Sequence, residues 1–232
     1  MVTDIRKSTF SAIRLHPGDD WPGPVIVKTD CNYGGQPERL AARRAGEESP
    51  RPTGAALWKA RLRYALPRAL RERIWHPLSD ADCLSPHAYP IFASLREVPR
   101  SAFDNPHLIV ERFVPERDGE RYCIRNYVFL GTAGIAYRRF SDHPLAKGRD
   151  AGEREEVQIP DELLDARRRL GFDYGRFDYV MREGRPILLD VNTTPTWLGT
   201  VRSPQQQAYT EILAGGLRGL IAKCVADPAS SA

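Results

Sequence analysis

The sequence predicts an α+β protein of two lobes that are built mainly from antiparallel strands. Runs of β-branched and aromatic residues are joined by short glycine-containing turns, which is typical of hairpins. Helical segments interrupt these strand pairs at irregular intervals, whereas a doubly wound parallel sheet needs a regular alternation of strand and helix. The 232 residues, of which 41% are hydrophobic, are enough to bury a core in one large domain or two small lobes.

The elements of the N-terminal half follow from apolar runs that end at polar turns. We predict, in order, a strand at 24–30, a glycine loop at 31–37, helical structure at 36–75, a strand at 89–92, a helical turn at 94–99 and a strand at 107–114. The long helical assignment depends on apolar residues spaced three and four apart from Trp58 to Ala69, with Pro67 interrupting the helix.

The C-terminal half contains two predicted hairpins and two helices. We predict strands at 121–131 and 132–140, a helix at 161–171, strands at 177–181 and 186–192, and a helix at 206–224. Gly171 is the expected C-cap of the first helix, because glycine tolerates a left-handed backbone. The tail at 226–232 has no apolar pattern and is expected to fray.

Charge and cysteine spacing argue against several classes of protein. A net charge of +4 is too small to indicate nucleic-acid binding, although residues 39–73 carry ten basic and three acidic side chains. The four cysteines lie far apart, which favours reduced thiols over a disulfide or zinc framework. No apolar stretch is long enough to span a membrane and the N-terminus has no apolar signal segment, so we expect a cytoplasmic protein.

Polar side chains end the last predicted hairpin. Alternation along a strand places Asp190 and Asn192 on one face, and Asp178 lies on the partner strand. If residues 183–185 form a three-residue loop, Asp178 faces Asp190 directly, with Cβ atoms about 4.5–5.5 Å apart. A two-residue loop would instead place Asp178 opposite Leu189 and send Asp190 to the other face.

This donor set suggests a metal site. Two facing carboxylates repel one another unless a cation lies between them. Two anionic oxygen ligands and one neutral one are what Mg²⁺ or Mn²⁺ accepts, with water and substrate phosphate completing the shell. The alternative is a solvated strand end in which Asp190 and Asn192 cap the following turn.

A lysine ends the first strand. Lys28 follows an apolar run, where a buried ammonium group needs an anion beside it. The loop that follows contains Gly34 and Gly35, whose backbone N–H groups could close on phosphate. It is not a Walker A loop, because no Gly-Lys-Ser/Thr ends it. A lysine that extends to solvent and an ordinary glycine turn explain these residues equally well.

Three segments together resemble the ATP-grasp superfamily, which includes D-alanyl ligases, glutathione synthetases, biotin carboxylases and ribosomal-protein glutamate ligases. They are PVIVKTDCNYGG, LIVERFVPERDGE and GFDYGRFDYVMREGRPILLDVNTTP, within a resemblance that covers residues 22–215. It implies an ATP-grasp fold of two α+β lobes with nucleotide bound between them. The N-terminal lobe would be 1–110 with a basic helical insert at 36–88, the C-terminal lobe 111–225, and the tail 226–232.

The resemblance also implies roles for single residues. Lys28 would hold the ATP phosphates, with Gly34 and Gly35 in the loop over them. The backbone of a hinge strand, consisting of Glu111, Arg112, Phe113 and Val114, would read the adenine edge, and Glu120 would accept the ribose hydroxyls. Asp178, Asp190 and Asn192 would bind one or two Mg²⁺ ions.

Arg125 would face the transferred phosphoryl group or the acyl phosphate and act with Lys28 in catalysis. A surface acid and a cross-strand salt bridge are the simpler explanations for Glu120 and Arg125. Arg138 and Arg139 are further candidates that an exposed sheet edge explains as well.

The activity that the resemblance implies is ATP- and Mg²⁺-dependent ligation. A substrate carboxylate would be activated as an acyl phosphate and captured by an amine or similar nucleophile, releasing ADP. A phosphotransferase acting on a small molecule and a non-catalytic nucleotide-binding module that needs a partner are the alternatives. A nucleic-acid partner is not expected.

The sequence departs from the family in two ways. Asp190 stands where most relatives have Glu, and only about twenty residues precede the lysine strand, where relatives usually have another domain. The basic insert is either a docking surface for an anionic substrate, partner protein or domain, or a solvated helix pair. Lys7 resembles the second lysine of some relatives but lies too close to Lys28 in sequence, so we assign it no role.

Overall fold

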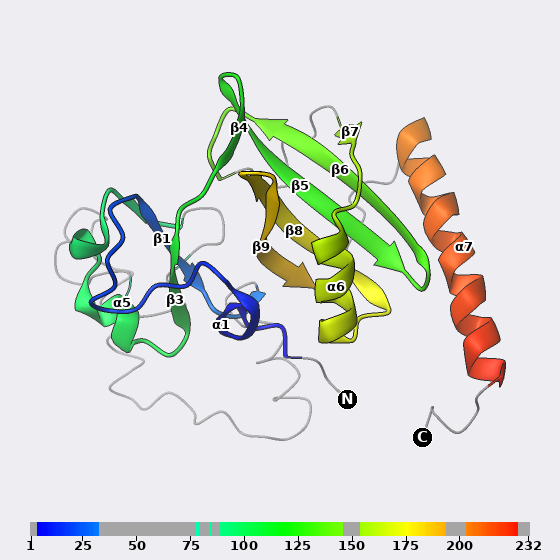
Figure 1. The fold of residues 1–232 in the computed structure, drawn as a ribbon, viewed down its shortest axis with the longest axis horizontal. Coiled ribbons are helices and arrows are strands. Elements are labelled where there is room, and N and C mark those ends of the chain that lie inside the picture. The colour runs from blue at the N-terminus through cyan, green and yellow to red at the C-terminus, as the bar shows by residue number, and fades with distance from the viewer. Residues whose placement is uncertain are drawn as a thin grey trace, which may run out of the picture. The chain divides into compact units, whose positions relative to one another are not determined.

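A computed structural model describes residues 4–32, 78, 84, 89–145, 154–193 and 203–226. The chain divides into two compact units, Ile13–Phe113 and Met1–Ala12 with Val114–Ala232. Each unit combines helices with an antiparallel sheet, which confirms the predicted α+β class (Figure 1). The first twelve residues group with the C-terminal unit, a feature that the sequence did not predict.

The unit Ile13–Phe113 contains a three-stranded sheet in the order β2-β1-β3. Its central strand, β1 (Val25–Thr29), is buried at all five positions, which explains its unbroken apolar run. The neighbouring strands are β2 (Ile91–Phe92) and β3 (Leu108–Arg112). The short helices η4 (Leu95–Glu97) and α5 (Arg100–Asp104) lie between these two strands in the chain. Val25, Val27 and Val110 form the centre of its core.

The other unit contains a six-stranded sheet in the order β7-β6-β5-β8-β9, with β4 paired to β5 (Figure 1). The strands are β4 (Glu116–Asp118), β5 (Arg121–Leu130), β6 (Ala133–Ser141), β7 (Arg154–Glu156), β8 (Tyr174–Arg182) and β9 (Arg185–Asn192). The helices are α1 (Lys7–Phe10), α6 (Asp161–Leu170) and α7 (Pro204–Ala226). Among the residues that the structure describes, no helix is long and apolar enough to cross a membrane.

The two faces of the six-stranded sheet pack against different helices. Tyr127 and Phe177 point to the side that Leu163 of α6 covers, which we call the α6 face. Val128 and Tyr137 point to the opposite side, where Tyr209 of α7 packs, and we call this the α7 face. Because side chains alternate along each strand, every residue of β5, β6 and β8 can be assigned to one face.

Most predicted elements are present, and α6 ends as expected at Gly171, whose φ of 68° is left-handed. The sequence missed four short elements: α1, α5, β4 and β7. Each has five residues or fewer, so none is long enough to show an apolar period. The helical structure predicted at 36–75 and the tail at 227–232 lie outside the described residues.

Candidate functional site

The β8–β9 hairpin brings Asp178 and Asp190 together by an unexpected route. Arg182 pairs with Arg185, so the loop has two residues and the predicted three-residue loop is wrong. Glu183 and Gly184 form it with φ of 52° and 77°, the left-handed values of a two-residue hairpin turn. The register then shifts between Asp178 and Tyr179, so that Asp178 still lies opposite Asp190.

The register shift is a β-bulge at Leu189. Tyr179 pairs with Leu188 and Asp178 pairs with Asp190, which leaves Leu189 as the extra residue. The bulge cancels the one-residue difference between the predicted and observed loops. Both carboxylates therefore lie on the α7 face, as the metal-site hypothesis requires.

Each carboxylate has a cation of its own. Arg176 Nε lies 2.7 Å from Asp178 Oδ1, and Arg176 Nη2 donates to Asp178 Oδ2 at 3.0 Å. Lys7 Nζ lies 3.3 Å from Asp190 Oδ1, which also accepts the Val191 amide at 3.1 Å. These pairs offset the repulsion between the two facing carboxylates.

Lys7 is almost fully buried, with 3% of its side chain exposed, and it belongs to the same unit as Asp190. The helix that carries it is anchored by Ile5 and Phe10, which pack against the α6-face core. We assigned Lys7 no role because it lies close to Lys28 in sequence. The two lysines nevertheless belong to different units.

The donor set around Asp178 fits a hard cation together with an anionic ligand. Asn192 lies opposite Arg176, one alternation step from Asp190 on the same face. Among the described residues, no group of three or more His, Cys, Asp or Glu side chains is placed to hold a metal. Mg²⁺ usually takes only part of its coordination shell from protein, and here that part would consist of Asp178, Asp190 and the Asn192 amide. The cations Arg176 and Lys7 are suited to bind phosphate oxygens.

A buried amide connects this cluster to the middle of the sheet. Asn126, which is 1% exposed, donates from Nδ2 to Asp178 Oδ1 at 2.6 Å. Its Oδ1 accepts a hydrogen bond from Arg139 Nε at 2.9 Å. The amide orientation is therefore fixed from both sides, and Asp178, Asn126 and Arg139 form one chain across three strands.

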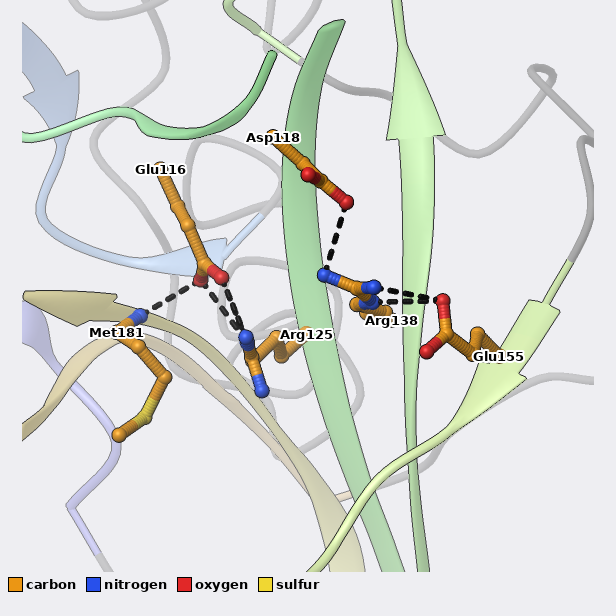
Figure 2. A network of polar contacts seen from close by, with 6 residues as sticks. All are labelled: Glu116, Asp118, Arg125, Arg138, Glu155 and Met181. Atoms are coloured by element: carbon orange, nitrogen blue, oxygen red, sulfur yellow. Dashed lines mark hydrogen bonds and ion pairs between the residues drawn. The ribbon is translucent and has the colours of Figure 1, made fainter. Parts of the chain in front are cut away.

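The structure does not bring Arg125 to this cluster. Arg125 pairs with Tyr179 in the β5–β8 register and therefore points to the α6 face, away from Asp178. Its guanidinium forms an ion pair with Glu116 of β4 at 2.6 Å, and Glu116 also accepts the Met181 amide at 2.7 Å (Figure 2). The simpler explanation, a cross-strand salt bridge, is what the geometry shows.

Cys123 lies beside this ion pair, opposite Glu116 in the β4–β5 register. Burial, together with the neighbouring Glu116, raises the pKa of the Cys123 thiol to about 12. The raised pKa favours the protonated thiol over the reactive thiolate.

The predicted nucleotide residues of the other unit lie on β1 and β3. Lys28 Nζ forms an ion pair with Glu111 Oε2, and both side chains are buried. Glu111 is thus the anion that a buried Lys28 requires. The two residues are diagonal neighbours, because Lys28 pairs with Ile109 and Ile26 pairs with Glu111. The prediction assigned Glu111 a backbone role only, and its side chain proves to be the partner of Lys28.

The remaining predicted residues are dispersed. Arg112 ends β3 with its guanidinium 4.7 Å from the Trp21 ring centre. Phe113 and Val114 are the residues at which the chain passes from one unit to the other. Glu120 is exposed in the turn between β4 and β5. Gly34 and Gly35 lie outside the described residues.

Three residues of the cluster were missed in the sequence: Arg176, Asn126 and Lys7. A signal for Arg176 was present, because a charged residue two positions before Asp178 in a strand must share its face. Asn126 is likewise a polar residue within an apolar run. Lys7 was noted for its resemblance to the second lysine of some relatives but was given no role, and its contact with Asp190 joins distant parts of the chain.

No protein-family model and no curated protein matches the sequence. Solved structures with some similarity include D-alanine–D-alanine ligase from Bacillus anthracis and the macrocyclase MdnC from Microcystis aeruginosa MRC, the latter bound with its precursor peptide MdnA.

The likeness to these structures is distant. The ligase complexed with ATP is 15% identical over 91% of this chain and 58% of that chain, with a TM-score of 0.37. A second ligase structure is 18% identical over 58% of this chain and 51% of that chain, with a TM-score of 0.34. The macrocyclase is 19% identical over 53% of this chain and 40% of that chain, with a TM-score of 0.32. The chain spans about half the length of these proteins, and its function is inferred below from its own residues.

Proposed function

We propose that this protein is an ATP- and Mg²⁺-dependent ligase that activates a carboxylate as an acyl phosphate for attack by an amine or similar nucleophile. One observation carries the proposal: Asp178 and Asp190 face each other on a sheet face that also holds Asn192 and Arg176, and Lys7 pairs with Asp190. Opposed hard oxygen donors beside paired cations are the parts that phosphoryl transfer requires. The segment that builds this face is also the one that most resembles the ATP-grasp superfamily.

Within this proposal the cluster residues have distinct tasks. Asp178, Asp190 and Asn192 would hold Mg²⁺, which when bound neutralises charge on the phosphates. Arg176 is held by Asp178 and shares the face of Asn192, so we assign it the charge-stabilising role that the resemblance gave to Arg125. Asn126 keeps Asp178 oriented by its hydrogen bond.

The reaction balances as two displacements. An oxygen of the substrate carboxylate bonds to the γ-phosphorus of ATP while the bond between that phosphorus and the bridging oxygen of ADP breaks. The nucleophile's nitrogen then bonds to the acyl carbon, phosphate leaves, and the proton of the amine passes to solvent.

Oxygen transfer tests this scheme directly. The chain is incubated with ATP, Mg²⁺ and ¹⁸O-labelled amino acids and dicarboxylic acids, and the phosphate released is analysed by mass spectrometry. Acyl phosphate formation transfers one ¹⁸O atom to phosphate, and Arg176→Gln should abolish the transfer. Arg138→Gln is the matched control, because Arg138 lies on the other face and pairs with Asp118 and Glu155 (Figure 2).

Two outcomes would overturn the ligase reaction. A stable phosphorylated product without amide formation indicates a phosphotransferase. Mg²⁺-dependent binding of ATP without turnover of any acid in the panel indicates a nucleotide-binding module.

A further inference from the structure

Arg139 is a half-buried cation on the α7 face of β6. Its Nε donates to the neutral amide of Asn126, and within the described part of the chain it forms no ion pair. Its neighbour Arg138, on the opposite face, has two acids, Asp118 at 3.1 Å and Glu155 at 2.8 Å. Burial lowers the pKa of Arg139. The negative charge of Asp178 counteracts this shift, whereas the positive charges of Arg176 and Arg154 add to it.

A second arginine stands directly opposite the first. Arg139 of β6 pairs with Arg154 of β7, so both point to the α7 face. Arg154 Cζ lies 5.1 Å from the ring centre of Tyr137, which occupies the same face one step along β6. The two guanidinium groups therefore belong to the same face at the β6–β7 edge of the sheet.

These arginines are separated from the carboxylate pair. Arg139 lies on β6 and Asp178 on β8, with β5 between them, so their backbones are two strand spacings apart, about 10 Å. Asn126 fills the intervening position and bonds to both. An anion bound between Arg139 and Arg154 would therefore be a different group from one bound at Asp178 and Asp190.

We propose that Arg139 and Arg154 form an oxyanion subsite at the β6–β7 edge of the α7 face, which binds a carboxylate or phosphate group of the substrate. Naming this group as part of the substrate depends on the proposed function, whereas binding of the anion does not. The substrate of the ligase would then carry a second anionic group beside the carboxylate that is activated. Planar guanidinium groups suit such oxygen pairs.

Titration with glutarate and with inorganic phosphate tests the subsite. Backbone amide signals of residues 137–140 and 154–156 are followed by NMR, first in the free protein and then with Mg²⁺ and a non-hydrolysable ATP analogue at saturation. We expect these signals to shift with one or both anions, and the preferred anion identifies the group as carboxylate or phosphate. Arg139→Gln should weaken binding by about tenfold, because a charge-assisted contact is lost.

Matched variants separate the subsite from a structural effect. Arg154→Gln should weaken binding of the same anion while leaving the Asn126–Asp178 hydrogen bond in place. If Arg139→Gln does not fold, this variant alone tests the subsite. Arg138→Gln removes the same charge from the opposite face and should leave anion binding unchanged.

Three results would overturn the subsite. The first is no anion binding at a concentration on the order of 10 mM, a very weak affinity. The others are equal binding in the wild type and both subsite variants, and displacement of the anion by the nucleotide analogue. If the anion binds through Arg139 and Arg154 while ATP does not bind at all, the subsite stands and the proposed function fails.

Discussion

At the scale of single residues, the two opposed carboxylates are compensated by the chain itself. Arg176 neutralises Asp178, and Lys7 neutralises Asp190. The pairing therefore does not by itself require a metal ion. A divalent cation bound at Asp190, as we propose, would have to share or displace the contact with Lys7, and Lys7 would then limit metal binding.

Lys7→Met should tighten Mn²⁺ binding in the absence of nucleotide, because a competing positive charge is removed from Asp190. Because Asp190 is 31% exposed, solvent screens this ion pair, and we expect an effect of about 1 kcal/mol, which lowers the dissociation constant about fivefold. Electron paramagnetic resonance of free Mn²⁺ measures it.

Arg6→Met is the matched control for this change. Arg6 precedes Lys7 but pairs with Asp4, so the variant alters net charge without affecting Asp190. Unchanged or weaker Mn²⁺ binding in Lys7→Met relative to this control would show that Lys7 does not compete for the site.

At the scale of elements, Glu116 joins three strands on the α6 face. It accepts hydrogen bonds from Arg125 of β5 and from the Met181 amide of β8 (Figure 2). Burial alone raises the pKa of Glu116, but these hydrogen bonds outweigh it and hold the pKa below its ordinary value of 4.5. The ionised form is thus the one that the folded state favours.

Glu116→Gln should remove a pH-dependent part of the stability. A carboxyl whose pKa is lowered by folding stabilises the protein above its unfolded pKa, and this contribution is lost as the pH falls through the folded pKa. We expect the wild type to exceed Glu116→Gln in free energy of unfolding at pH 6, and the difference to shrink as the pH falls below 4.5.

Urea unfolding at several pH values measures the effect of Glu116. Glu120→Gln, on the exposed turn of the same hairpin, should show no such trend. A difference between the wild type and Glu116→Gln that stays constant from pH 6 to pH 3 would contradict the role of the ionised carboxylate.

Helix α7 approaches the β5–β6 turn so closely that only glycine fits at one position. A Cβ atom on Gly216 would lie 1.8 Å from the carbonyl oxygen of Leu130, whereas Gly215 has open space around it. Gly216→Ala should therefore destabilise the unit by about 1–3 kcal/mol through overpacking.

Gly215→Ala is the internal comparison for this helix contact. It should be neutral or stabilising by up to about 1 kcal/mol, since alanine favours helix. Thermal unfolding of both variants decides the matter, and equal stability would show that α7 does not rest on the hairpin as described.

At the scale of the whole molecule, the fold class could be predicted and the site only in part. Alternation and turn residues were enough to identify the long strands and the shared face of Asp190 and Asn192. The pairing of Asp178 with Asp190 was predicted through the wrong loop, because a bulge at Leu189 leaves no mark in sequence.

Long-range contacts account for the rest of what the sequence could not show. The face of Arg125 becomes known only with the β5–β8 register, and the approach of Lys7 to Asp190 depends on how the first twelve residues pack. Both are tertiary properties that local pattern does not encode.

The ATP binding that we propose would act on the whole chain, and it would be read from global stability. A ligand present at a hundredfold excess over its dissociation constant stabilises the folded state by about 2.7 kcal/mol, or about 5–10 °C in melting temperature for a chain of this size. Asp118, an acid that pairs with Arg138 on the other face, provides the control position.

The most direct test is the melting temperature with ATP, with and without Mg²⁺, in the wild type, Asp190→Ala and Asp118→Ala. We predict a shift of about 5–10 °C that depends on Mg²⁺ in the wild type and in Asp118→Ala and is lost in Asp190→Ala. If Mg²⁺ adds nothing to the effect of ATP in the wild type, the carboxylate pair is not a metal-nucleotide site.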